Sequence, residues 1–183
     1  MVTESLRAYS IDPTHSDVQF SVRHLMISKV RGHFRAVSGL IVLPLDSIVP
    51  TSVNVTIDAS TIETRDPQRD AHLKSADFLD VEKFPSLRFA SEAVRGIDAQ
   101  TFEVDGTLEI RGSQRPVTLK ASIDGSGKDP WGNDRVAYEA TVKISRKDWG
   151  LTYNQVLEAG GVAIGDEIDI LINVEAIPRT SAA

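Results

Sequence analysis

Apolar and polar residues alternate with a period of two along much of the chain, which is the pattern of β-strands with one buried face. In the segment 102–110, Phe102, Val104, Leu108 and Ile110 fall on one face, and acidic residues and threonine occupy the other. The segment 117–123 alternates in the same way. Between the two lies Arg111-Gly-Ser-Gln114, where Gly112 can adopt a positive φ. These segments predict a β-hairpin.

Alternation recurs in several other parts of the chain, less regularly in the first half. The further segments are 18–22, 30–36, 40–45, 53–57, 87–89, 136–144 and 168–174. About eight or nine strands are therefore predicted, a number at which an antiparallel sheet can close into a barrel. Because each strand has a single apolar face, a parallel βαβ sheet is excluded. A sandwich, a packed barrel and a hollow barrel all fit this pattern, and packed interiors are the rule.

One short helix is predicted after Asp66-Pro67, because aspartate is a favoured N-cap and proline fits the first helical position. The helix would extend over 68–78, which contains neither glycine nor proline. A second helical turn is expected over 154–159, ending at Gly160-Gly161.

No linker or internal repeat divides the chain, so one barrel domain is expected over residues 9–178. A flexible N-terminus is expected over 1–8 and a flexible tail over 179–183. Loops are expected over 125–132 and 160–166, where glycine and aspartate gather.

Composition and charge narrow the choice of partners. The chain has 183 residues, of which 41% are hydrophobic and 25% are charged, as in an ordinary globular protein. Its net charge of -6 repels a phosphate backbone, which argues against nucleic acid and against an anionic membrane as partners. The segment Met1–Ser10 carries Glu4 and no apolar stretch follows it, so a signal peptide is not expected. No apolar run approaches the ~20 residues of a membrane helix. A cytoplasmic protein without stable membrane insertion is expected.

The residues that could carry catalysis or bind a metal form no established motif. The absence of cysteine excludes disulfides, zinc–thiolate sites and cysteine nucleophiles. The sequence also lacks a GxSxG elbow, a phosphate-binding loop and a dinucleotide fingerprint. No catalytic residue, metal site or cofactor is therefore predicted. The spacing of the four histidines matches no zinc pattern: His15, His24, His33 and His72.

His24 shares a strand face with Phe20 and Val22. A polar group on that face must be hydrogen-bonded or must touch a ligand. One interpretation is a structural histidine held by Asp70 or Arg69, and the other is contact with the polar end of a ligand. Trp131 lies in a polar loop, where it could either fold over the barrel mouth as a lid or be an ordinary exposed aromatic residue. A salt bridge between Arg146 and Asp148 is expected near a barrel end.

Several short motifs follow one another in a characteristic order. They are Phe20–Leu25 (FSVRHL), Val30–Phe34 (VRGHF), Arg69–Leu73 (RDAHL), Asp77-Phe78, Phe84-Pro85, Phe89, Gly106–Ile110 (GTLEI), Pro116-Val117 and Arg146–Gly150 (RKDWG). Their order and spacing resemble those of the YceI family of polyisoprenoid-binding proteins. The resemblance covers Tyr9 to Pro178, which is nearly the whole chain.

The resemblance implies an extended, antiparallel, eight-stranded lipocalin-like barrel with an internal apolar tunnel. It also implies binding of a polyisoprenoid, an isoprenoid quinone or a fatty-acid-like amphiphile, often in a homodimer. Three positions depart from residues that are common in the family. Leu79 and Trp149 stand where phenylalanine is frequent, and Glu109 stands where threonine is frequent. Trp149 is therefore a candidate determinant of ligand choice.

The leading hypothesis is a carrier that sequesters or transports the apolar tail of a lipid in the barrel. An alternative is a lipid isomerase or hydrolase that uses the same cavity, with His24 as general base. A third is a structural or interaction protein with a solid core. For the carrier, the residues expected to contact the ligand are Phe20, Val22, His24, Phe34, Val42, Val55, Phe89, Phe102, Val104, Leu108, Leu119, Tyr138, Ile144, Trp149, Ile170 and Ile172.

Overall fold

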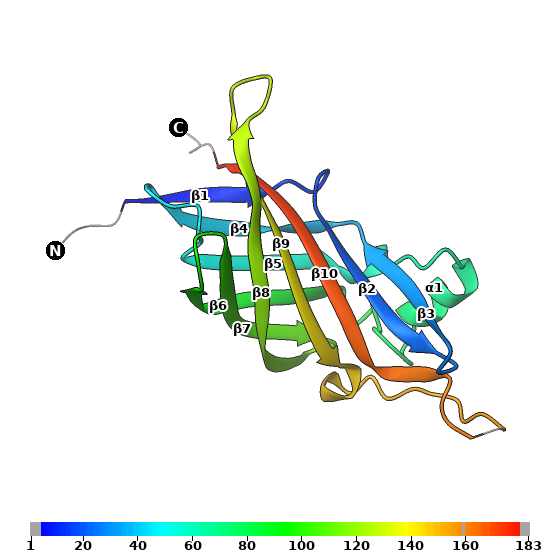
Figure 1. Ribbon diagram of the computed structural model, residues 1–183. Coiled ribbons are helices and arrows are strands. Elements are labelled where there is room, and N and C mark those ends of the chain that lie inside the picture. The colour runs from blue at the N-terminus through cyan, green and yellow to red at the C-terminus, as the bar shows by residue number, and fades with distance from the viewer. Residues whose placement is uncertain (1–4, 159, 180–183) are drawn as a thin grey trace.

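Antiparallel pairing joins the strands into one sheet in the computed structural model, which describes residues 5–158 and 160–179. The neighbour order is β1-β4-β5-β6-β7-β8-β9-β10-β2-β3, and β1 also pairs with β10. That additional pairing closes β1 and β4–β10 into a barrel (Figure 1), so the expected eight-stranded antiparallel barrel is confirmed. The strands are β1 (Leu6–Ile11), β2 (Asp17–His24), β3 (Ser28–Phe34), β4 (Val37–Pro44), β5 (Ser52–Asp58), β6 (Ser86–Gly96), β7 (Thr101–Ile110), β8 (Ser113–Lys128), β9 (Asp134–Ser145) and β10 (Ile164–Pro178).

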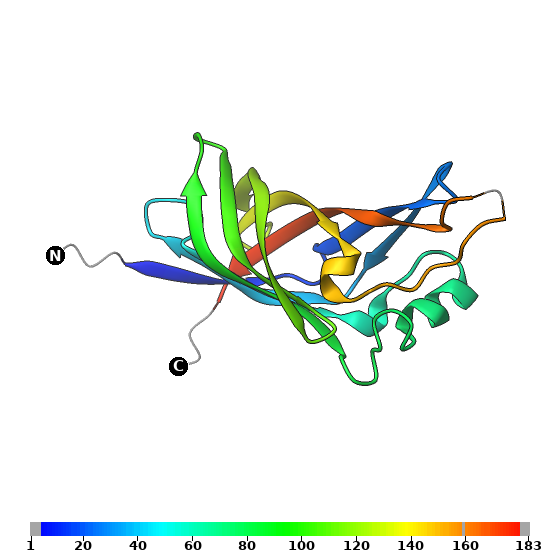
Figure 2. The ribbon, with the colours of Figure 1, turned by 90° about the horizontal axis from the view of Figure 1, so that it is seen from below.

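One edge of β10 serves two partners in succession. Its first part, Ile164 to Asn173, pairs with β2, and its last residues, Ala176 to Pro178, pair with β1. The other edge pairs with β9. The β2–β3 hairpin therefore extends the sheet beyond the closed barrel. Figure 2 shows this hairpin on one side of that end and helix α1 (Pro67–Lys74) on the other.

The predicted hairpin of β7 and β8 is confirmed with its turn. Ile110 pairs with Ser113, which leaves a two-residue loop. Both loop residues have a positive φ, 50° at Arg111 and 71° at Gly112. This is the turn geometry that matches the twist of the flanking strands, and Gly112 adopts it without steric cost.

The predicted α-helix is present and shorter than expected. Helix α1 spans Pro67–Lys74, and the Asp66 carboxylate accepts hydrogen bonds from the backbone N–H groups of Gln68 (3.0 Å) and Arg69 (3.1 Å). It ends before residue 78 because the chain becomes extended at Ser75. Two 3₁₀ helices, η1 (Ala59–Thr61) and η2 (Arg146–Trp149), complete the elements.

The second expected helical turn and both expected loops need correction. Within 154–158 the chain is not helical, because Val156 forms a bridge with Val162, and residue 159 lies outside the described residues. Strand β8 continues to Lys128 and β10 begins at Ile164, so both expected loops are partly strand. Hydrogen bonding to the neighbouring strand outweighs the low strand propensity of the glycines there.

The expected termini also overlap described structure. Strand β1 begins at Leu6, inside the segment expected to be flexible, and its alternation is too short to stand out in the sequence. The backbone N–H of Arg179 donates to Ala8 O at 2.8 Å. Residues 1–4 and 180–183 lie outside the described residues. No helix among the described residues is long and apolar enough to cross a membrane.

An ion cluster around Arg135 ties β9 to the turn that follows β1. The guanidinium contacts Asp12 at 3.0 Å, Asp129 at 3.2 Å and Glu175 at 2.5 Å. Hydrogen bonds from Asn133, and then from Arg135, lower the pKa of Asp129 to about 2. The pKa of Asp12 also lies well below its ordinary value, because its carboxylate accepts hydrogen bonds from Thr14 first and then from His15 and Arg135.

Three side chains of this cluster lie close enough to hold a metal ion. The ligand atoms of Asp12, His15 and Glu175 lie within 4.8 Å of one another. Arg135, however, already bonds both carboxylates.

The cluster predicts how stability depends on acid. A carboxyl whose pKa is lowered on folding stabilises the native state above its unfolded pKa of about 4, and this contribution is lost as pH falls through the folded value. We therefore expect the free energy of unfolding to fall between about pH 4 and about pH 2, and less steeply in Arg135→Gln. Urea denaturation across this range measures the slope. Arg88→Gln on the exposed face of β6 is the control, and equal slopes for wild type and Arg135→Gln would contradict the assignment.

Candidate ligand-binding cavity

An apolar cavity of about 220 Å³ lies inside the barrel. All ten strands and α1 contribute to its wall, and among the described residues every wall atom that faces the empty space is apolar. An apolar cavity of ~150 Å³ already stays dry and accepts a small hydrocarbon. The space inside this barrel is thus suited to hydrocarbon and poorly suited to water.

Small residues account for part of this hollow. Ala121 on β8 lies directly opposite Ala140 on β9, and Ala140 lies opposite Ile172 on β10. All three line the cavity. Leu108 and Ile172 remain only half-buried although they face inward, because no side chain occupies the space before them. The barrel is therefore hollow, which decides between the packed and hollow interiors that alternation left open.

Aromatic packing contributes to the wall at one end of the cavity. Phe102 and Tyr138 form a T-shaped pair with ring centroids 5.9 Å apart. The Tyr138 hydroxyl donates to the backbone carbonyl of Ile48 at 2.6 Å. Burial raises the pKa of this phenol far above its ordinary value, so it stays neutral at physiological pH. Its polar atom is thereby satisfied within the protein.

The opposite end of the cavity is where strand pairing does not complete the wall. Beyond the closed barrel, β3 forms a bridge with the segment after η1 between His33 and Glu63 and is not paired with it as a strand over the described residues. The cavity residues at this end form what we call the mouth: Phe20, Val22, Leu73 and Ile164. The Phe20 ring lies across Gly32, where a side chain would come within 2.4 Å of it. Gly32 is therefore required for this arrangement of the mouth.

Polar groups stand next to the mouth. His72, on α1, shares a hydrogen bond of 2.7 Å between its Nε2 and Asp77 Oδ2. The His72 ring packs edge-on against the rings of Tyr153 and Phe78, with ring centroids 4.8 Å and 5.1 Å apart. Phe78 lines the cavity. His72, Asp77 and Tyr153 therefore lie beside the cavity residue Phe78.

Arg146 is the one charged residue of the cavity wall among the described residues. It is 2% exposed, and its guanidinium donates to the carbonyls of Leu151 at 2.5 Å, Tyr153 at 2.9 Å and Gly165 at 2.9 Å. Burial lowers its pKa. Because its donors are engaged by backbone, Arg146 holds the segment after η2 in place and offers little to a ligand. Its nearest carboxylate is Asp166, 3.6 Å away, and not the expected Asp148.

A family model, the YceI-like domain, matches residues 9–176. The chain belongs to the YceI-like family. The UPF0312 protein of Enterobacter sp. (strain 638) is 37% identical over 175 residues, covering 94% of this chain and 88% of that protein. Protein YceI of Escherichia coli O157:H7 is 36% identical over 173 residues, covering 93% and 87%.

Solved structures share the YceI-like barrel. The Campylobacter jejuni YceI protein has 30% identity and a TM-score of 0.74, with 86% of this chain and 90% of that chain covered. A polyisoprenoid-binding domain from Saccharophagus degradans has 14% identity and a TM-score of 0.70, with 94% and 99% covered. At that identity the likeness shows the fold alone.

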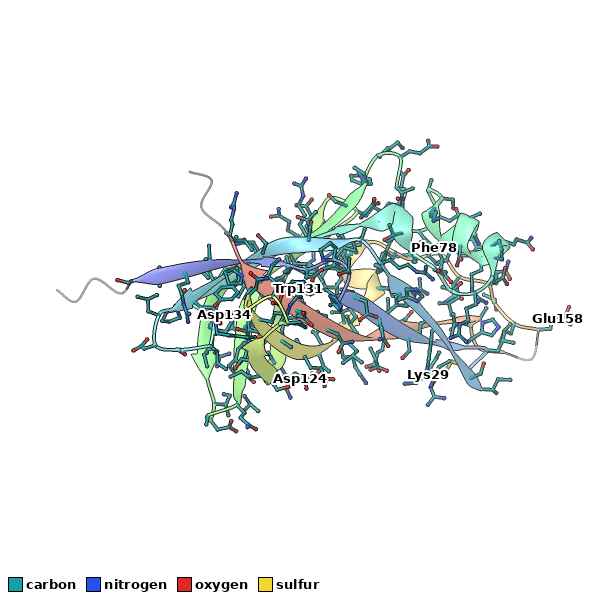
Figure 3. The ribbon with its side chains drawn as sticks, turned by 90° about the horizontal axis from the view of Figure 1, so that it is seen from above. Lys29, Phe78, Asp124, Trp131, Asp134 and Glu158 are labelled. Carbon is teal, nitrogen blue, oxygen red and sulfur yellow. The ribbon has the colours of Figure 1, made fainter. Side chains whose placement is uncertain are left out.

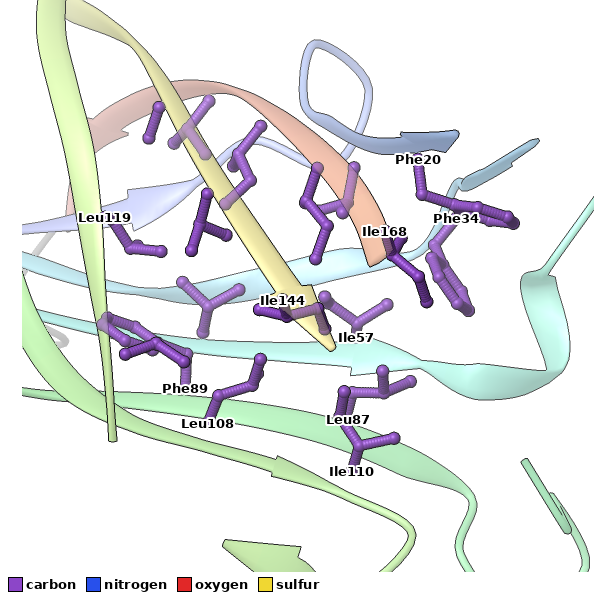
Figure 4. Close-up of a pocket in the computed structure, with 18 of the residues that line it drawn as sticks. Phe20, Phe34, Ile57, Leu87, Phe89, Leu108, Ile110, Leu119, Ile144 and Ile168 are labelled. Carbon is purple, nitrogen blue, oxygen red and sulfur yellow. The ribbon is translucent and has the colours of Figure 1, made fainter. Parts of the chain in front are cut away.

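Most residues that the sequence placed inside the YceI-like barrel do line the cavity. Figure 4 shows several of them pointing into it, with Phe20 and Phe34 at one end and Leu119 at the other. The expected residues that line it are Phe20, Val22, Phe34, Val55, Phe89, Phe102, Val104, Leu108, Leu119, Tyr138, Ile144, Ile170 and Ile172.

Val42 does not line the cavity, and its neighbour Ile41 does. The run Leu40-Ile41-Val42-Leu43 is apolar at every position, so a period of two cannot tell which residues face inward. Pairing with β1 resolves the ambiguity, because Ile41 lies opposite the buried Tyr9.

Trp149 is buried outside the cavity wall and is not a lining residue. It belongs to η2, where the chain leaves the strand geometry of β9, so the alternation of β9 no longer applies. Its indole N–H donates to Leu108 O at 3.0 Å. Among the departures from common family residues, Leu79 reaches the cavity and Trp149 does not.

His24 also lies outside the cavity wall, at the last position of β2. The partners suggested for it are engaged elsewhere. Arg69 donates to Thr64 Oγ1 at 2.7 Å, and Asp70 accepts from Thr64 N at 2.8 Å. The side chains of α1 therefore tie the helix to Thr64 and not to His24. His24 itself lies opposite the mouth residue Ile164 in the register of β2 and β10.

Sequence reasoning missed the wall at the mouth. Leu73, Phe78 and Leu79 come from α1 and the turns after it, which carry no strand alternation. The family-like motifs Arg69–Leu73 and Asp77-Phe78 fall on this segment and could have identified it. Trp131, by contrast, is 81% exposed and does not contribute to the cavity wall.

Proposed function

We propose that this protein binds one long-chain apolar ligand inside its barrel and carries or stores it. The ligand class is a polyisoprenoid, an isoprenoid quinone or a fatty-acid-like amphiphile. The observation that carries the proposal is the unfilled cavity whose accessible wall is apolar throughout the described residues. The polyisoprenoid-binding domain of Saccharophagus degradans, which shares the fold, supports the isoprenoid class.

The affinity would come from removing hydrocarbon from water. Each buried methylene contributes about 0.8 kcal/mol, so even a modest length of chain provides enough free energy for binding. The tail would enter from the mouth, where β3 lies beyond the closed barrel. The polar end would then remain beside His72, Asp77 and Tyr153.

Binding without turnover fits the chemistry of the wall better than catalysis does. The titratable side chains that line the cavity in the described part of the chain are Tyr138 and Arg146. The Tyr138 hydroxyl is bonded to Ile48 and the Arg146 guanidinium to backbone carbonyls, so neither is poised to transfer a proton to a ligand. The function proposed is therefore sequestration or transport.

Native mass spectrometry of delipidated protein tests this function. After extraction in organic solvent and refolding, the protein is incubated with detergent-solubilised polyprenols of increasing length. We expect a complex of one ligand per chain whose stability rises with ligand length, and none with a single-isoprene alcohol. The same spectra report whether the chain is a monomer or a homodimer. Absence of a complex with every polyprenol, quinone and fatty acid offered would overturn the proposal.

A further inference from the structure

The turn between β2 and β3 exposes three consecutive apolar side chains, which we call the β2–β3 tip: Leu25, Met26 and Ile27. They are 37%, 59% and 80% exposed. Large apolar residues that are exposed singly are ordinary, but a contiguous group is a mark of an interaction surface.

The backbone conformation of the tip does not favour apolar residues at these positions. Leu25 has a φ of 51° and Met26 a φ of 61°. Two successive left-handed residues favour asparagine and glycine, whereas leucine and methionine adopt them at a conformational cost. The turn therefore carries apolar side chains at positions where local structure would select against them.

The tip lies at the mouth end of the molecule. The Leu25 N–H donates to Ala163 O at 2.9 Å, next to the mouth residue Ile164. Val156, which is 86% exposed, lies in the neighbouring segment after η2. Figure 3 shows Lys29 and Glu158 toward this end, and Trp131 away from it. Apolar exposure and access to the cavity thus occur together.

The hairpin is also basic within an acidic chain. Its residues, 17–34, contain three arginines and lysines and one aspartate, whereas the chain has a net charge of -6. Arg23 lies directly opposite Lys29 in the strand register, an unfavourable pairing of like charges. Lys29 is paired with Asp169, but Arg23 and Arg31 form no ion pair within the described residues. An anionic surface would complement these two charges.

We propose that the β2–β3 tip docks this protein on a bilayer that contains anionic phospholipids. The three apolar side chains would enter the interface, and Arg23 and Arg31 would contact lipid phosphates. The inference rests on the proposed function, because a long-chain apolar ligand resides in membranes and docking at the tip turns the mouth toward that source. The net negative charge opposes approach, but charges beyond ~8 Å are screened at physiological salt, so docking is local and reversible.

Vesicle sedimentation tests docking without the ligand. The vesicles are phosphatidylcholine with one third phosphatidylglycerol, free of isoprenoid. The tip variant combines Leu25→Asn, Met26→Gly and Ile27→Thr, which supplies favoured turn residues and so preserves the hairpin. We expect it to partition to vesicles at least about tenfold more weakly than wild type. Arg23→Gln should weaken partition about fivefold on these vesicles and leave it unchanged on pure phosphatidylcholine.

Trp131→Ser is the matched control, because Trp131 is as exposed as Ile27 and lies away from the mouth. Its partition should equal that of wild type. Equal partition of the tip variant and wild type, or no partition of wild type, would overturn docking.

A second readout separates this inference from the proposed function. Uptake of a polyprenol from detergent should be equal in wild type and the tip variant, whereas uptake from polyprenol-containing vesicles should be at least about tenfold slower in the tip variant. Wild type that sediments with vesicles but takes up no polyprenol from detergent would overturn the carrier function and leave docking standing. Equal rates of uptake from vesicles would overturn the role of the tip in loading.

Discussion

Replacing Ala121 and Ala140 together by leucine is expected to lower ligand uptake at least about tenfold while the barrel stays folded. The two alanines are neighbours on the adjacent strands β8 and β9, and both line the cavity. Each leucine adds three carbons to a space that the ligand would occupy. Excluding only two ligand methylenes costs about 1.6 kcal/mol of binding, which is more than tenfold in affinity. Native mass spectrometry with a polyprenol measures the loss.

The matched control places the same change on the outer face of the sheet. Ala90 and Ala93 on β6 are exposed, so Ala90→Leu with Ala93→Leu should leave uptake unchanged. The cavity variant should change the free energy of unfolding by less than about 1.5 kcal/mol, because added apolar burial offsets any strain. A folded cavity variant that takes up ligand as wild type does would show that the ligand binds elsewhere.

Arg146→Ala is expected to lower the free energy of unfolding by about 3 kcal/mol. The substitution removes the donors to the Leu151, Tyr153 and Gly165 carbonyls. Those acceptors lie on the segment after η2 and at the start of β10. The Arg146 side chain that bonds them is buried. Buried carbonyls without donors are costly, and the substitution also leaves a void. Urea denaturation followed by circular dichroism measures the change.

Two comparisons test whether the loss comes from these hydrogen bonds. Arg88→Ala on the exposed face of β6 should change stability by less than about 0.5 kcal/mol. Arg146→Lys keeps the charge but presents one donor group in place of a planar fork, so it should recover only part of the loss. Full recovery by lysine would mean that charge, and not the geometry of the donors, stabilises this corner.

The sequence predicts the inner faces of β7–β10 well because their alternation is strict. In β7, for example, polar residues alternate with Phe102, Val104 and Leu108. Only one of the two possible orientations of the strand therefore turns these apolar side chains inward. The turn at Gly112 fixes the register of β7 against β8. The phase of β4 was not predictable in this way, because its central residues are apolar at both parities and only pairing with β1 selects Ile41 over Val42.

Other features depend on tertiary structure that alternation does not encode. Whether the barrel is hollow depends on the volume of residues that meet across strands, such as Ala121 and Ala140. The position of Trp149 depends on where β9 gives way to η2. The wall at the mouth comes from α1 and the turns after it, which leave no periodic signal in the sequence.

The shared edge of β10 also has a consequence for how the chain folds. Contacts such as Tyr9 with Pro178 join residues that are far apart in sequence, and none of them can form until the final strand has been synthesised. Until then the apolar inner faces of the earlier strands have no closed wall. Folding dominated by such distant pairings is slow and exposes the chain to aggregation. A hydrocarbon present at that stage would shield these faces from water before the wall closes around it.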